Sequence, residues 1–193
     1  MQSFADGAWH NEPETFSVRD RELDVTTDAN TDFWRETHYG FVRDNGHFFA
    51  MTAGSSFTAQ VRVRAKFEHL YDQAGLMLRL DDRRWVKAGI EFSDGRPLLG
   101  SVLTNEMSDW ATGDYAGDPL NFCLRLTLTE GVLRIQASDI GEIWQLVRLC
   151  PFPRSESYLV GPMCCSPQRA GLNVNFSNWS LGPALGKDLH DLT

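Results

Sequence analysis

Two neighbouring segments of the chain, 73–79 and 85–91, alternate along the sequence with a period of two. That period places every second side chain on the same face of a β-strand. The residues that share one face are Gln73, Met77 and Arg79 on the first segment, and Trp85, Lys87, Gly89 and Glu91 on the second. This set could bind a sugar, because hydroxyls need hydrogen-bond donors and acceptors and the apolar face of a sugar can rest on an aromatic ring.

A turn at 81–83 joins these segments into a predicted hairpin. The apolar residues that alternate with the polar ones must all face the core, so the polar sets of both strands share the other, exposed face. Gly75 and Gly89 lack side chains and predict a hollow on that face. The alternative is that Lys87 and Glu91 form cross-strand ion pairs on a solvated face, where each pair contributes little.

Aromatic residues supply the second candidate region. Segment 34–41 contains His38 and Tyr39 near the end of a strand or in a loop, where they could line a groove. The candidate platforms for a sugar ring are Trp34, Trp85 and Trp110. Segment 108–110 could be a loop that closes one side of the groove, or an Asx turn. The alternative for 34–41 is a packed aromatic corner with His38 hydrogen-bonded inside it.

The elements that would carry these residues are strands. Segments 57–67 and 122–128 also alternate apolar and polar residues, and turn residues separate many short strands of this kind. No stretch longer than one turn keeps a helical period. This pattern predicts an all-β, two-sheet antiparallel jelly-roll sandwich in a single domain, 1–193, with 182–193 as a surface tail.

Four blocks of residues resemble a known family. They are 31–41 (TDFWRETHYGF), 71–77 (YDQAGLM), 85–92 (WVKAGIEF) and 108–110 (SDW). Together, over roughly Phe4 to Trp179, they resemble the regulation-of-enolase-type family of concanavalin A-like jelly rolls. The resemblance implies a concanavalin A-like fold, whose superfamily includes lectins and glucanases, and the family name suggests an effect on a metabolic enzyme.

A hydrolase of the glucanase type is not favoured. Retaining glycosidases use two carboxylates about 5 to 5.5 Å apart, and the superfamily's glucanases place theirs in a Glu-x-Asp-x-Glu run on one strand. The nearest run, 22–26, lacks the last acid, and Glu91 has Gly89 and Lys87 where a second acid would stand. Glu91 could therefore act as a catalyst only with His38 or with an acid from another strand.

Charge and composition exclude several other classes. The net charge is −8, and the charges are scattered without a basic run, which disfavours nucleic acid and anionic membranes as partners. No segment approaches the roughly 18 apolar residues of a membrane helix. The N-terminus lacks the basic start and apolar stretch of a secretory leader, so we expect a cytoplasmic protein.

The sequence predicts no metal site and no cofactor. The four cysteines, at 123, 150, 164 and 165, match no zinc or redox spacing, and we expect them to be buried or half-buried thiols. The adjacent pair 164–165 should point to opposite faces of its strand. Asp28, Asn30 and Asp32 imitate the start of a calcium loop, but positions 33 and 39 are Phe and Tyr instead of Gly and Glu.

These observations favour a non-catalytic module that binds a carbohydrate or sugar-like metabolite on the concave sheet face. The predicted ligand-binding residues are Trp34, His38, Tyr39, Gln73, Arg79, Trp85, Lys87, Glu91 and Trp110. One alternative is a protein-interaction module that modulates a metabolic enzyme through a flat apolar patch or a free sheet edge. A carbohydrate-active hydrolase that uses Glu91 is the other alternative, and exposed sheet edges are compatible with a homodimer.

Overall fold

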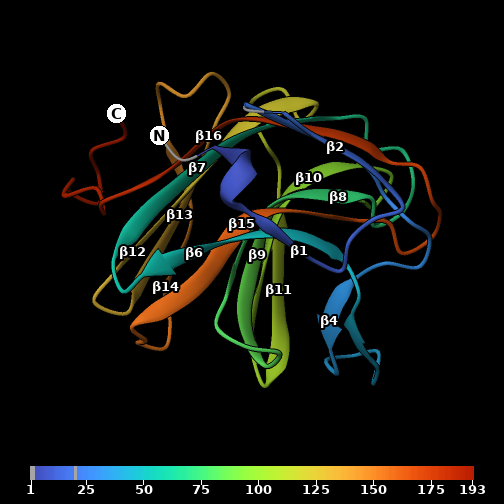
Figure 1. Ribbon diagram of the computed structural model, residues 1–193, viewed down its shortest axis with the longest axis horizontal. Helices are drawn as coiled ribbons and strands as arrows, with labels where there is room; N and C mark the ends of the chain where they lie inside the picture. The colour runs from blue at the N-terminus through green and yellow to red at the C-terminus, as the bar shows by residue number, and fades with distance from the viewer. Residues whose placement is uncertain (1–2, 20) are drawn as a thin grey trace.

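The computed structural model describes residues 3–19 and 21–193 as two antiparallel sheets, a short hairpin and a single-turn helix, η1 (Phe4–Asp6). Sheet A runs in the order β1 (Ala8–His10), β6 (His47–Gly54), β15 (Ser157–Cys165), β8 (Gln73–Arg79), β9 (Arg84–Ser93), β10 (Arg96–Asn105) and β11 (Met107–Gly113). Sheet B runs in the order β14 (Gln145–Pro151), β13 (Val132–Ser138), β12 (Asn121–Thr129), β7 (Phe57–Ala65), β16 (Asn173–Gly182), β3 (Glu22–Thr26) and β2 (Thr15–Arg19). Figure 1 shows this sandwich, with the short strand β4 (Phe33–Arg35) outside the two sheets, where it pairs with β5 (Val42–Asp44).

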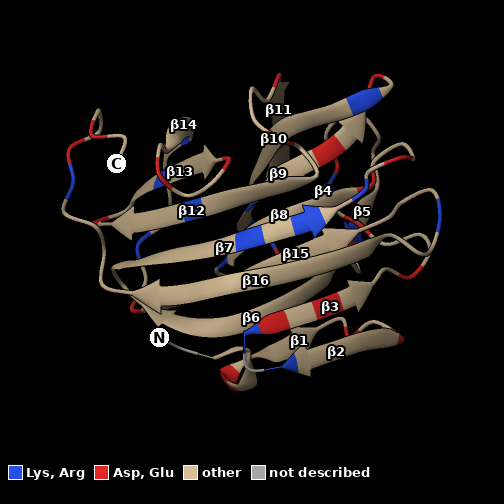
Figure 2. Cartoon of the chain, turned by 90° about the horizontal axis from the view of Figure 1, so that it is seen from above, with Lys and Arg blue, Asp and Glu red and all other residues tan. Residues whose placement is uncertain are grey.

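The main core lies between the two sheets, as the alternating pattern predicts. It contains the apolar residues Leu76, Leu78, Val86 and Ile90 of the predicted hairpin, together with Val61, Val63, Leu124 and Leu126 of sheet B. Burial of apolar side chains at about 25 cal/mol per Å² is the main force that holds the sheets together. Figure 2 shows acidic and basic residues spread over strands and loops, in agreement with the scattered charges of the sequence.

The β8–β9 hairpin places the polar residues of both strands on one face, as predicted. Gln73 lies opposite Glu91, and Gly75 lies opposite Gly89. A Cβ atom added to Gly75 would lie 1.9 Å from the backbone oxygen of Ala88, so the two strands approach too closely at this point for any side chain. The glycines therefore permit a close backbone approach, and Gly89 also lines a hollow on the outer face of sheet A, the face that turns away from sheet B.

The outer face of sheet A is covered, and this corrects the expectation of an exposed polar face. A second apolar cluster lies there and contains Phe33, Trp34, Phe48, Met77, Trp85, Val102, Met163 and Cys165. The adjacent cysteines point to opposite faces as predicted, because Cys164 belongs to the main core and Cys165 to this second cluster. All four cysteines are free, three of them buried and one half-buried.

The β4–β5 hairpin is the element that covers this face, and polar contacts fix it to three strands of sheet A. Asp44 of β5 accepts two hydrogen bonds from Arg79 of β8, at 2.6 and 2.7 Å. The backbone N–H of Arg35 donates to Ser108 Oγ of β11 at 2.9 Å. Asp32, which directly precedes β4, accepts a hydrogen bond from Lys87 Nζ of β9. The hairpin is therefore held in place over the polar residues that the sequence singles out.

The segment after β16 returns along sheet B. The backbone N–H of Leu185 donates to Thr58 Oγ1 at 3.0 Å, and Arg134 donates to the carbonyl oxygens of Lys187 and Asp188. This end of the chain is thus attached to sheet B, away from the outer face of sheet A. None of the helical structure in the described part of the chain has the length and apolar character of a membrane span.

Candidate functional site

A cavity of about 300 Å³ lies on the outer face of sheet A. Its floor is formed by Gln73 of β8, Lys87 and Glu91 of β9, and Val102 of β10. Its walls come from the β4–β5 hairpin, from β11 and from the loop that carries Pro167 and Gln168. Ligand pockets typically measure about 300–1,000 Å³, so this cavity suits a small ligand.

Lys87 and Asp32 form a buried ion pair at the floor. The distance from Lys87 Nζ to Asp32 Oδ1 is 3.0 Å, and the Lys87 side chain is 4% exposed. Burial is the largest single influence and would lower the pKa of Lys87. Asp32, Cys165 and Glu91 together outweigh it, so the pKa of Lys87 is raised. Lys87 is therefore paired with Asp32, which precedes β4, and is buried. The alternative expected it to pair with a residue of a neighbouring strand on a solvated face.

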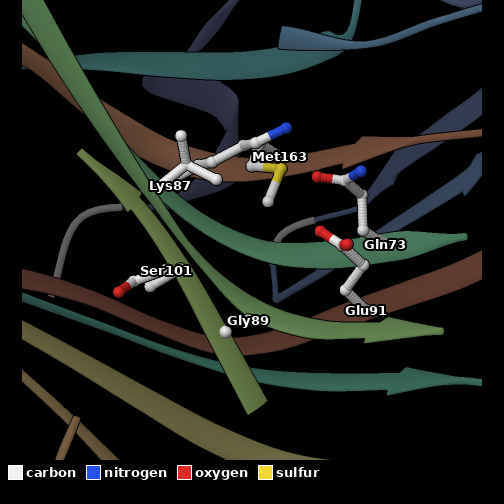
Figure 3. Close-up of a pocket in the computed structure, with 9 residues that line it drawn as sticks. Gln73, Lys87, Gly89, Glu91, Ser101 and Met163 are labelled. Carbon is white, nitrogen blue, oxygen red and sulfur yellow. The ribbon is translucent and has the colours of Figure 1, made fainter. Parts of the chain in front are cut away.

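Glu91 is buried without a partner for its carboxylate. The residue is 8% exposed, and no hydrogen bond or ion pair joins the carboxylate to another described residue. Figure 3 shows the side chains of Glu91 and Gln73 next to each other on the same side of the sheet. Burial raises the pKa of Glu91 to about 7; the charge of Asp32 adds to this rise and that of Lys87 opposes it.

Aromatic rings form the walls. The rings of Trp34 and Trp110 lie edge to face with centroids 6.5 Å apart, and Tyr71 lies edge to face with Trp110 at the same distance. Tyr39 contacts Trp34 at 5.7 Å and stacks on Phe41 at 5.4 Å. The hydroxyls of Tyr39 and Tyr71 share a hydrogen bond of 2.8 Å, which raises the pKa of Tyr71 to about 12. The walls thus form one continuous aromatic surface above a charged floor.

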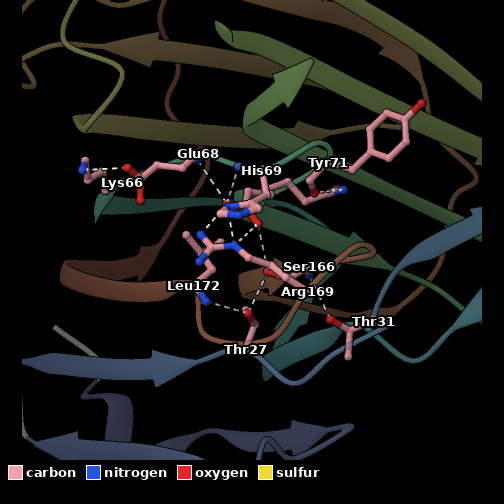
Figure 4. A network of polar contacts seen from close by, with 11 residues as sticks. Thr27, Thr31, Lys66, Glu68, His69, Tyr71, Ser166, Arg169 and Leu172 are labelled. Carbon is pink, nitrogen blue, oxygen red and sulfur yellow. Dashed lines mark hydrogen bonds and ion pairs between the residues drawn. The ribbon is translucent and has the colours of Figure 1, made fainter. Parts of the chain in front are cut away.

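A buried polar network holds the loop at the cavity rim. The carboxylate of Asp72 accepts hydrogen bonds from the backbone N–H groups of Glu68 and His69 and from the side chains of Ser166 and Arg169 (Figure 4). Burial alone would raise the pKa of Asp72, but the hydrogen bonds from Arg169 and the backbone lower it. Because Ser166 and Arg169 flank Pro167 and Gln168, this network positions the rim beside the start of β8.

Comparison with known proteins places the chain in a family. The family described as "Protein of unknown function (DUF1349)" matches residues 9–184. The chain belongs to this family. It is 57% identical over 187 residues to "Regulation of enolase protein 1" of Saccharomyces cerevisiae, and the match covers 97% of this chain and 94% of that protein. The resemblance inferred from the four sequence blocks is therefore confirmed.

Solved structures confirm the fold. A crystal structure of a functionally unknown protein from Saccharomyces cerevisiae has a TM-score of 0.94 and 55% identity, and covers 95% of this chain and 100% of that chain. The exoplasmic/lumenal domain of VIP36 in its Ca²⁺/Man3GlcNAc-bound form has a TM-score of 0.55 at 9% identity, with 96% and 87% coverage. A GH43 protein of Bacillus licheniformis has a TM-score of 0.73 at 12% identity, and 92% of this chain matches 37% of that one. At such low identities the last two comparisons show the all-β sandwich alone.

Six of the nine predicted ligand-binding residues line the cavity of this DUF1349 protein. They are Trp34, Tyr39, Gln73, Lys87, Glu91 and Trp110. They come from three separate parts of the chain, and the β4–β5 hairpin and β11 bring them together over β8 and β9. Segment 108–110 is part of strand β11 and is neither a loop nor an Asx turn, although Trp110 does form one side of the cavity.

The other three predicted residues lie outside the cavity lining. Arg79 is buried in its ion pair with Asp44, where it fixes the hairpin. Trp85 is 1% exposed and packs edge to face on Phe33 at 6.1 Å, so it is a core residue and offers no platform. His38 is exposed, has a φ of 63° in the hairpin turn, and contacts the ring of Tyr39 from outside.

Sequence reasoning missed several residues that line the cavity. They are Asp32, Phe41, Tyr71, Val102, Pro167 and Gln168. Asp32 and Phe41 belong to the first block of the family resemblance, and Tyr71 begins the second, so the blocks contained a signal for these three. Nothing in the local pattern around residues 167–168 indicates that they reach the cavity.

Proposed function

We propose that this protein is a non-catalytic binding module that holds a carbohydrate or sugar-like metabolite in the cavity on the outer face of sheet A. The observation that carries the proposal is the combination of buried polar groups at the floor with aromatic walls around them. Gln73, Lys87 and Glu91 offer donors and acceptors for hydroxyl groups, and they are held rigidly by β8 and β9. Trp34 and Trp110 offer surfaces for the apolar side of a sugar ring.

The shared fold is compatible with sugar binding and does not identify a ligand. The VIP36 domain has the same kind of sandwich and was solved in a Ca²⁺/Man3GlcNAc-bound form. Fold likeness alone is weak evidence for function, so the residues of this cavity carry the proposal. The charge arrangement also fits binding, because Lys87 is already paired with Asp32 and holds one side of the floor in place.

A ligand screen followed by titration of a cavity variant tests the proposal. Thermal shift against mono- and oligosaccharides and sugar phosphates should give a concentration-dependent rise with one sugar class, because a ligand that binds the folded state stabilises it. Calorimetry should then show that Trp110→Ala weakens binding about tenfold, with Phe16→Ala as the matched control. Both aromatic residues are about equally exposed, at 37% and 38%, but Phe16 lies on sheet B.

Two results would contradict the proposal. Unchanged affinity in Trp110→Ala would show that the ligand binds elsewhere, and the absence of any thermal shift would show that no member of the screened classes is bound. Product analysis after long incubation with the bound sugar distinguishes binding from hydrolysis. Turnover that Glu91→Gln abolishes would favour the hydrolase.

A second candidate function follows from the relative named "Regulation of enolase protein 1". We infer that this protein could modulate enolase, either directly or through the state of its ligand cavity. Enolase activity measured with increasing amounts of the purified protein tests this inference. A change in enolase activity that saturates near an equimolar amount of the protein would support the inference. An unchanged enolase rate over that range would contradict direct modulation.

A further inference from the structure

When Glu91 is ionised, the cavity carries an excess of negative charge, and a cation bound beside Glu91 would favour this ionised form. Asp32 and Glu91 are the two carboxylates in its lining, and Lys87 is the one cation among the described residues that line it. Because Lys87 already donates to Asp32, no cation in the described part of the chain forms an ion pair with Glu91. A buried carboxylate without a hydrogen-bond partner is costly, so Glu91 is a group that a ligand can satisfy.

The aromatic walls favour the same kind of partner. The rings of Trp34, Tyr39, Phe41, Tyr71 and Trp110 all line the cavity. Trp34 and Trp110 stand at 87° to one another, and Tyr71 and Trp110 at 77°, so the rings enclose the space from more than one direction. The face of an aromatic ring is electron-rich and attracts cations, above all in a site from which water is excluded.

We propose that the ligand carries a protonated amine, as an amino sugar does, and that this ammonium group binds against Glu91 within the aromatic walls. The inference rests on the proposed function and names the ligand class of the same cavity. The ammonium would donate to the unpaired carboxylate of Glu91, and Gln73, which lies opposite Glu91 in the sheet, would accept or donate one further hydrogen bond. Anionic sugars would be rejected, because their charge would meet Asp32 and Glu91.

Matched pairs of sugars test the amine requirement. Calorimetric titration at pH 7 compares glucosamine, galactosamine and mannosamine with glucose, galactose and mannose, and includes N-acetylglucosamine as a neutral derivative and glucose 6-phosphate as an anion. At least one hexosamine should bind ten times more tightly than its parent hexose. The N-acetyl derivative should bind no better than the hexose, and the phosphate should not bind.

Substitution of Glu91 tests the residue assigned to the amine. Glu91→Gln keeps the shape of the side chain and removes its charge. The ratio of hexosamine affinity to hexose affinity should therefore fall from about ten to about one, whatever the change in hexose affinity itself. The matched control is Glu156→Gln, an exposed glutamate outside the cavity, which should keep the full preference. Thermal melting confirms that each variant is folded, and if Glu91→Gln does not fold, the sugar pairs in the wild-type protein decide the question.

The outcomes separate this inference from the proposed function. Equal affinity for hexosamine and hexose, or tighter binding of the phosphate, would contradict the requirement for an amine. Either result would leave the proposal of sugar binding intact. A tenfold preference that persists in Glu91→Gln would overturn the role of Glu91. Binding of none of these compounds, together with no response in the wider sugar screen, would overturn both proposals.

Discussion

The ionisation of Glu91 should make the stability of this protein depend on pH in a way that one substitution removes. The pKa of Glu91 is about 7 in the folded protein, compared with an ordinary value of 4.5. Between those two values the unfolded chain loses its proton while the folded protein keeps it. The free energy of unfolding contributed by Glu91 therefore falls as pH rises from about 4.5 to 7, and the loss is complete above 7.

The size of this effect follows from the difference in pKa. Each pKa unit corresponds to about 1.4 kcal/mol, so the full shift corresponds to about 3 kcal/mol. Glu91→Gln stays neutral at every pH and does not suffer this loss. Relative to the wild type, the variant should therefore gain about 3 kcal/mol in free energy of unfolding between pH 4.5 and pH 8. The charged and titratable groups nearest to Glu91 are Lys87, Asp32, Tyr71 and Cys165, and they are present in both proteins.

Urea unfolding at pH 4.5 and pH 8 measures the difference. The midpoint of Glu91→Gln should rise relative to the wild type at the higher pH without a change in the m-value. The control is Glu156→Gln, whose exposed side chain should leave the gap to the wild type the same at both values of pH. If the gap between Glu91→Gln and the wild type is also the same at both, Glu91 ionises like an ordinary carboxyl and the reasoning about its burial is refuted.

Three further substitutions test how the cavity is built. Asp32→Asn should lower the free energy of unfolding by about 3 to 5 kcal/mol in urea titrations, because Lys87 would remain buried without its counter-ion; an effect below about 1 kcal/mol would show that water solvates the lysine. Gly89→Ala should cost about 3 kcal/mol or more, or prevent folding, because its Cβ would lie 2.0 Å from a backbone oxygen. Gly54→Ala, with open space around it, is the control and should change little. Arg169→Ala should weaken ligand binding in calorimetry by loosening the cavity rim. Arg169→Lys, whose side chain lacks the planar guanidinium, should restore only part of the affinity.

Much of this fold could be predicted from the sequence because a β-strand has a period of two. Alternation placed Leu76 and Val86 in the core and Gln73 and Glu91 on the opposite face, and the structure has both arrangements. The same rule separated Cys164 from Cys165. Alternation is a local property of the chain, so it is fully present in the sequence.

What covers the outer face of sheet A was decided only by the tertiary structure. Alternation indicates which side of a strand a residue occupies, but it contains no information about which distant segment packs there. Asp32 lies 55 residues before Lys87 in the chain, and Asp44 lies 35 residues before Arg79. These contacts pair the cations of the predicted binding face with acids in or directly before the β4–β5 hairpin. Among the residues that the structure describes, Glu91 is left without a partner. The polar residues could thus be found from the sequence. Their roles depend on long-range packing: Arg79 fixes the hairpin, Lys87 pairs with Asp32, and Glu91 remains an unpaired acid among the described residues.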